Sequence, residues 1–161
     1  RRCRLIGGIG NSMILGNFDS TFAAHPEMAL YIPLIGGTGG NVGTQSSALV
    51  VQGLANSSLD AKNTFKQVSK EAVVALINAT IISLLVYTYN FIRFGATATV
   101  TYSVSISLFS VVMFASIFGT LVPMTLEKMK IDPAIATGPF IAITNDIIGM
   151  MMYMGITVLL S

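Results

Sequence analysis

The stretch IDPAIATGPFIAITNDIIGMMMYMGITVLLS, residues 131–161, places one acidic residue, Asp146, far inside an otherwise apolar run. Thirteen uncharged residues precede Asp146 and fifteen follow it. A run of this length can cross a bilayer as a helix, because the hydrocarbon core requires about 20 apolar residues. A carboxylate at the centre of such a helix costs roughly 2.5–3.5 kcal/mol on insertion scales. We therefore expect Asp146 to face a cation, a proton or a water-filled path.

The composition of the whole chain is that of a membrane protein. Hydrophobic residues make up 53% and charged residues 10% of the 161 residues, whereas soluble domains contain about 25% charged residues. The net charge of +2 is too small and too divided among loops to indicate nucleic-acid binding. Cys3 is the single cysteine, which excludes a disulfide within the chain. No nucleophile–base pair or metal-ligand cluster is apparent, so we do not expect an enzyme.

The hydrophobic pattern predicts five helical elements. They are residues 5–18, 28–55, 72–92, 99–126 and 133–160. The last four are long enough to span a bilayer. The first would reach only about 21 Å at 1.5 Å per residue, so it is a shortened span, a half-inserted helix or part of a longer helix. The predicted fold is an all-α membrane protein with a five-helix transmembrane bundle.

Basic residues cluster between the predicted spans, and this distribution predicts the orientation. With the amino end in the cytoplasm and the carboxyl end outside, every basic residue except Arg93 lies on the cytoplasmic side, as the positive-inside rule requires. Lys62, Lys66 and Lys70 stand four residues apart, on one face of a helix. That face belongs either to an anionic lipid surface or to a solvated connector helix.

The second element contains a glycine run, PLIGGTGGNVGTQSSA, at residues 33–48. Small residues let helix backbones approach closely in lipid, and several glycines weaken a helix in a way that is tolerated only against protein or a wet cavity. A stripe of polar and small residues follows one face of this helix, with Thr44 at its edge. The stripe consists of Thr38, Asn41, Gln45, Ala48 and Gln52. A single such residue indicates interhelical hydrogen bonding, but the whole stripe together with Asp146 favours a pathway for ions.

Two stretches resemble the MgtE family of magnesium channels and transporters. PLIGGTGGNVGTQSSALVVQGLA, residues 33–55, is similar to the second transmembrane helix of the family, and DPAIATGPFIAITNDIIG, residues 132–149, to the fifth. The resemblance covers residues 1–161 as one transmembrane domain of a cell (inner) membrane protein. The short first helix departs from the family pattern.

The resemblance implies a homodimer with a central pore lined by the second and fifth helices. It also implies a magnesium site built around Asp146 and the backbone carbonyl of Ala142. Cytosolic regulatory domains are expected upstream in a full-length protein. As further candidate ligands for the ion we select Asn41, Thr44, Gln45 and Gly37.

The chemistry of the candidate ligands agrees with a hard divalent cation. Mg²⁺ prefers octahedral oxygen ligands and releases its water reluctantly, so carboxylates usually hold it through water. Two copies of Asp146 facing each other across a dimer axis would supply two negative charges. Neither cysteine nor histidine lies near Asp146, which argues against a soft metal. Oxygen ligands also permit Ca²⁺, Mn²⁺ or Co²⁺, so the preference for Mg²⁺ comes from the resemblance.

Three functions remain open at this point. The first hypothesis is a magnesium channel or transporter domain that moves Mg²⁺ across the membrane into the cytoplasm. The second is a secondary transporter coupled to Na⁺ or H⁺, because an intramembrane Asp146 serves either mechanism. The third is an assembly domain without transport activity, in which the glycine faces only join helices.

Overall fold

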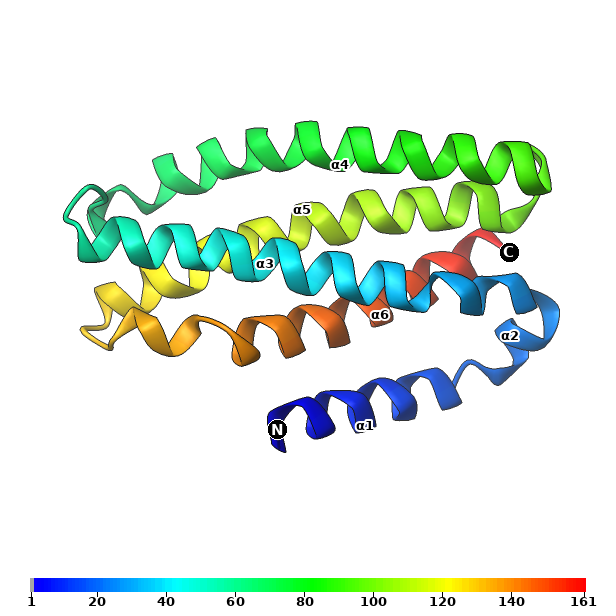
Figure 1. Cartoon of the computed structure of the whole chain (residues 1–161), viewed down its shortest axis with the longest axis horizontal. Coiled ribbons are helices and arrows are strands. Elements are labelled where there is room, and N and C mark those ends of the chain that lie inside the picture. The colour runs from blue at the N-terminus through cyan, green and yellow to red at the C-terminus, as the bar shows by residue number, and fades with distance from the viewer. Residues whose placement is uncertain (1) are drawn as a thin grey trace.

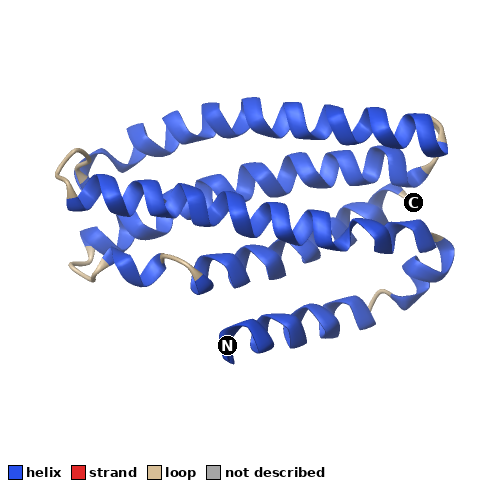
Figure 2. Cartoon of the chain, in the orientation of Figure 1, coloured by secondary structure: helices blue, strands red, loops and turns tan. Residues whose placement is uncertain are grey.

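The computed structural model describes residues 2–161, and for residues 2–4, 61 and 136 it describes the backbone alone. Every regular element in residues 2–161 is a helix, which confirms the all-α prediction (Figure 2). The elements are α1 (Arg2–Gly16), α2 (Asp19–Ala24), η1 (Pro26–Tyr31), α3 (Ile32–Ala55), η2 (Ala61–Asn63), α4 (Thr64–Phe94), α5 (Thr99–Lys128), η3 (Pro133–Ala136) and α6 (Pro139–Leu160).

Helix α5 is the centre of an elongated bundle (Figure 1). It packs against α3, α4 and α6, while α3 also packs against α6, and α1 lies along α6. Helix α5 has more buried residues than any other described element, whereas α4 buries little of its surface. This arrangement leaves most of α4 facing outward, where its apolar side chains suit a lipid environment.

Three helices are long and apolar enough to cross a membrane: α4, α5 and α6. Helix α3 has 24 residues and no charged residue, but its glycines and polar side chains keep its hydropathy below that of the other three. Only part of α1, Leu5–Gly16, is apolar, and it is too short to qualify. The structure therefore supports three of the five predicted spans by length and composition.

Buried aromatic hydroxyl groups fix the end of the bundle where α3 begins. The predicted span 28–55 does not start as one helix, because residues Pro26–Tyr31 form a separate 3-10 turn, η1. Met28 and Tyr31 of this turn are buried. The hydroxyl of Tyr153 donates to the carbonyl oxygen of Met28 at 2.7 Å, and the hydroxyl of Tyr31 donates to the side chain of Asn90. These bonds hold η1 against α6 and α4.

The fifth predicted element is interrupted rather than continuous. Residues Pro133–Ala136 form η3, where the Asp132 carboxylate accepts from the backbone N–H of Ala134 at 2.9 Å, as expected of an N-cap. The chain then breaks at Gly138, whose φ of +66° and ψ of −126° suit glycine alone, and α6 starts at Pro139. The prediction of a single helix over residues 133–160 was therefore wrong.

Of the two alternatives for the lysine-rich segment, a separate connector helix is not seen among the described residues, where the segment forms η2 and the start of α4. Lys66 and Lys70 lie in the first turns of α4, which begins at Thr64 rather than Ala72, and Lys62 lies in η2. Glu71, which directly follows Lys70, lies inside α4 as well.

Candidate cation site between helices α3 and α6

The site is built where α3 and α6 approach each other at Gly40. A Cβ atom added to Gly40 would lie 2.6 Å from the Oδ1 atom of Asp146 and 3.6 Å from the carbonyl oxygen of Ala142. Real Cβ atoms do not show the first of these distances, so the Asp146 side chain would have to shift if residue 40 carried a side chain. The structure thus brings two of the predicted ligands, Asp146 and the Ala142 carbonyl, to one spot on α3.

Close approach continues along the same face of α3. A Cβ atom at Gly43 would collide with the side chain of Asn145, and one at Gly119 of α5 would collide with the Gly43 backbone. The glycine run therefore lets three helix backbones meet, as small residues do in membrane bundles. This contact explains the glycines at positions 40 and 43 without any need for a flexible helix.

Asp146 is half-buried against Gly40. Among the described residues, no side chain forms an ion pair or hydrogen bond with its carboxylate; the one ion pair found joins His25 to Glu27 at 3.6 Å. The described part of the chain also contains no group of three His, Cys, Asp or Glu side chains that could hold a metal. A single chain therefore offers one carboxylate without a side-chain partner among the described residues, with the backbone oxygen of Ala142 close to the same glycine.

The remaining predicted ligands all lie on α3, between Gly37 and Gln45. The hydroxyl of Thr44 donates to the Gly40 carbonyl at 2.7 Å, which leaves its oxygen able to accept. Asn41 and Gln45 are exposed. Gly37 is exposed too, and a Cβ atom there would meet nothing within 4 Å. Gly37 is thus not part of the contact with α6, but lies on the open face of α3.

The predicted polar stripe of α3 is real and uncovered in the single chain. Asn41, Gln45, Ala48 and Gln52 are all exposed, whereas Thr38 is half-buried. Amide side chains cannot face acyl chains without a large cost. This face of α3 therefore requires water or another protein surface against it.

Nothing in the sequence pattern singled out Asn145 or Glu71. Asn145 is 1% exposed, and neither its side-chain oxygen nor its nitrogen has a hydrogen-bond partner among the described residues. Glu71 of α4 accepts hydrogen bonds from Ser46 of α3 at 2.8 Å and from Ser116 of α5 at 3.1 Å. A single asparagine beside an acid, and a glutamate at the end of a lysine-rich segment, looked ordinary before the helices were packed.

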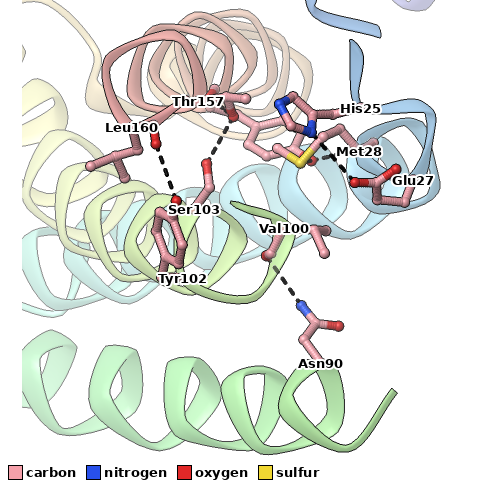
Figure 3. Close-up of polar contacts among 10 residues, drawn as sticks. His25, Glu27, Met28, Asn90, Val100, Tyr102, Ser103, Thr157 and Leu160 are labelled. Carbon is pink, nitrogen blue, oxygen red and sulfur yellow. Dashed lines mark hydrogen bonds and ion pairs between the residues drawn. The ribbon is translucent and has the colours of Figure 1, made fainter. Parts of the chain in front are cut away.

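The polar contacts at the far end of the bundle connect helices and do not converge on Asp146. Figure 3 shows Ser103 of α5 beside Thr157 of α6, with their hydroxyl oxygens 3.0 Å apart, and Tyr102 donating to the carbonyl of Leu160 at 3.2 Å. His25 and Glu27 lie close to Met28 in the same view. Ser103 and Ser116 of α5 both form hydrogen bonds to other helices.

The fold and the site define a membrane protein whose helices place a lone carboxylate and a polar face where a cation could reach them. The chain belongs to the MgtE family, described as divalent cation transporters, whose family model matches residues 32–156. The resemblance inferred from the two sequence stretches is thereby confirmed. A family of transporters also agrees with the prediction that the chain is not an enzyme.

Curated relatives point to the same family. The chain is 32% identical over 149 residues to the magnesium transporter MgtE of Bacillus subtilis. The matched region covers 92% of this chain and 33% of that protein. It is 31% identical over 156 residues to the protein of the same name from Thermus thermophilus, covering 97% of the chain and 34% of the relative. The chain thus spans about a third of the length of these relatives.

Proposed function

We propose that this chain is the pore-forming part of a magnesium transporter. Two copies form a homodimer in the cell membrane, and α3 and α6 of each copy line a central pore. Mg²⁺ passes through it into the cytoplasm, down its electrochemical gradient. The observation that carries the proposal is the Asp146 carboxylate, unpaired among the described residues and seated against Gly40 beside the Ala142 carbonyl. The names of the relatives, magnesium transporters, support the choice of ion.

Asp146 is the central ligand of the proposed site. One carboxylate from each copy neutralises the divalent charge, and the ion keeps most of its water because Mg²⁺ dehydrates reluctantly. The Ala142 carbonyl, Asn41, Thr44 and Gln45 hold the water shell through hydrogen bonds, and Gly37 leaves space one turn before Asn41. The uncovered polar face of α3 supports this arrangement, since a second copy and a wet pore would satisfy its amides.

The orientation and the partners are part of the same proposal. The amino end faces the cytoplasm and the carboxyl end lies outside, which keeps Lys62, Lys66 and Lys70 on the cytoplasmic side. Regulatory domains in the cytosol are expected to precede the pore, and the share of the relatives that this chain covers is compatible with such additional regions.

The test is Mg²⁺ flux into liposomes that contain the purified protein. We expect flux that requires no Na⁺ or H⁺ gradient, and a reduction of at least about tenfold in Asp146→Asn, because a single-sign site raises local cation concentration by that order. Glu127→Gln, which removes an exposed carboxylate at the end of α5, should retain full flux. Flux that appears only with a counter-ion gradient would instead identify a coupled transporter. Full flux in Asp146→Asn would disprove the proposed site.

A further inference from the structure

A carboxylate joins three helices on the side of α3 that faces α5. Glu71 of α4 is half-buried, and its Oε1 atom accepts from the hydroxyl groups of Ser46 and Ser116. Ser46 is 4% exposed and Ser116 is 2% exposed, and their oxygens lie 3.2 Å apart. We call Glu71, Ser46 and Ser116 the three-helix cluster. Its members come from α4, α3 and α5, which are separate in the sequence.

Ser46 and Ser116 donate to a side chain of another helix, whereas several other hydroxyl groups on helices of this chain donate to their own helix. Ser105, Ser110 and Thr120, all on α5, donate to the carbonyl four residues earlier in their own helix. Such a bond is available to any helical serine. Ser46 and Ser116 donate to the Glu71 side chain instead. The carboxylate therefore draws both hydroxyls to one point.

The cluster and the contact with Asp146 lie at two places along the same helix, α3. Ser46 lies six residues after Gly40, about 9 Å further along the helix at 1.5 Å per residue. While Ser46 is held toward α4 and α5, Gly40 faces Asp146, and Asn41 and Gln45 remain on the open face. Successive residues are about 100° apart on a helix. A rotation of α3 would therefore bring a residue with a side chain, such as Asn41, toward the Asp146 carboxylate, which now lies against Gly40.

We propose that Glu71 is a positioning residue for the cation path. It touches no ion, and acts through Ser46 and Ser116 by holding α3 in the rotation that seats Asp146 against Gly40. This inference rests on the proposed function of Asp146, but the rotation of α3 can be measured separately from transport.

The first test measures the rotation by thiol labelling in the intact protein with its cysteines, including Cys3, replaced by serine. Val50 of α3 is 1% exposed, so Val50→Cys should react slowly with N-ethylmaleimide, whereas Gln45→Cys on the open face reacts readily. Adding Glu71→Leu should raise the labelling rate of Val50→Cys by about tenfold, while Glu127→Gln leaves it unchanged. An unchanged rate in Glu71→Leu would overturn the inference.

The second test measures Mg²⁺ flux per folded molecule together with thermal unfolding. We expect maximal flux to fall by about tenfold in Glu71→Leu, and by a similar factor in the Ser46→Ala, Ser116→Ala double variant. Combining all three changes should lower the flux no further, because the effects of substitutions within one hydrogen-bond network are not additive. The triple variant should regain thermal stability, since no polar side chain of the three-helix cluster is left without its partner, but not flux.

The results of the two tests distinguish a failure of this inference from a failure of the proposed function. Recovery of both stability and flux in the triple variant would show that the cluster only packs helices, and would overturn the positioning role. If Asp146→Asn retains flux, the proposed cation site fails, and the labelling result alone then shows whether Glu71 orients α3. A Ser110→Ala variant, whose hydroxyl bonds within its own helix, serves as the matched control and should behave as the unmodified protein.

Discussion

The contact between Gly40 and Asp146 is the residue pair on which the proposed site depends. Asp146 could be selected from the sequence, because an acid in a long apolar run is rare and costly. Gly40 could not be separated from Gly36 or Gly37, since the residue that meets α6 is decided by the rotation of α3. The structure makes this distinction: a Cβ atom at Gly40 would strike the carboxylate, whereas at Gly36 and Gly37 nothing lies within 4 Å.

Gly40→Ala should therefore impair transport while Gly36→Ala should not. The added methyl group would lie 2.6 Å from Oδ1 of Asp146 and would displace the carboxylate. We expect Mg²⁺ flux to fall by about tenfold, since a displacement of a positioned group by about 1 Å costs one to two orders of magnitude. Flux assays in liposomes measure this, and equal flux in the two variants would contradict the close contact.

Asn145 allows a test of stability at the residue scale. Its buried side chain has no hydrogen-bond partner in the described chain, so Asn145→Leu removes an unsatisfied group and should keep or raise the unfolding temperature. Asn90 is also fully buried, but it accepts from Tyr31, so Asn90→Leu should destabilise the fold by about 1–3 kcal/mol. Thermal unfolding in detergent compares the two. A large loss in Asn145→Leu would mean that its amide is bonded.

At the scale of helices and turns, the sequence predicted elements better than their ends. Helix α5 begins at Thr99 as expected, and Asp132 caps the turn η3. The start of α4 was placed too late because lysines were taken as marks of a connector, although exposed lysines are ordinary in the first turns of a helix at the membrane surface. The break at Gly138 was missed, since residues 133–160 form one apolar run, in which Pro139 proved to occupy the first turn of a new helix.

The break before α6 predicts that alanine substitutions at Gly138 and at Gly155 have different effects on stability. Gly138 has a φ of +66°, whereas Gly155 lies inside α6 with no atom within 4 Å of an added Cβ. Gly138→Ala should destabilise the protein by about 1–3 kcal/mol, the cost of holding a side chain in this backbone region. Gly155→Ala should be neutral or slightly stabilising, because alanine favours helix. Unfolding by heat distinguishes them, and equal effects would argue against the break.

At the scale of the whole molecule, α3 packs between α5 and α6, and this packing brings the glycine run of α3 against Asp146 of α6. The all-α class followed from composition and periodicity, and the predicted family is confirmed by the match over residues 32–156. Which helices touch was not predictable, because the polar residues on the two sides of α3 look alike in sequence. Asn41 and Gln45 turn outward, while Ser46 turns inward to Glu71.

The uncovered polar face of α3 predicts association between copies of the chain. Replacing the exposed Gln45 by a bulky tryptophan should weaken a homodimer, because the side chain would enter the proposed contact or pore. The same change at Leu85, which is 67% exposed on the outer face of α4, should have no effect on association. Native mass spectrometry measures the ratio of dimer to monomer, and an equal ratio in both variants would place the interface elsewhere.

The central claim is that two copies of Asp146 hold one Mg²⁺ between them. Isothermal titration of the purified protein with Mg²⁺, carried out in parallel for the unmodified protein and for Asp146→Asn, tests this most directly. We predict that the unmodified protein binds one Mg²⁺ for every two chains at this site and that Asp146→Asn loses this binding. The variant should keep its fold and any Mg²⁺ binding elsewhere on the protein. Identical isotherms for the two proteins would contradict the account.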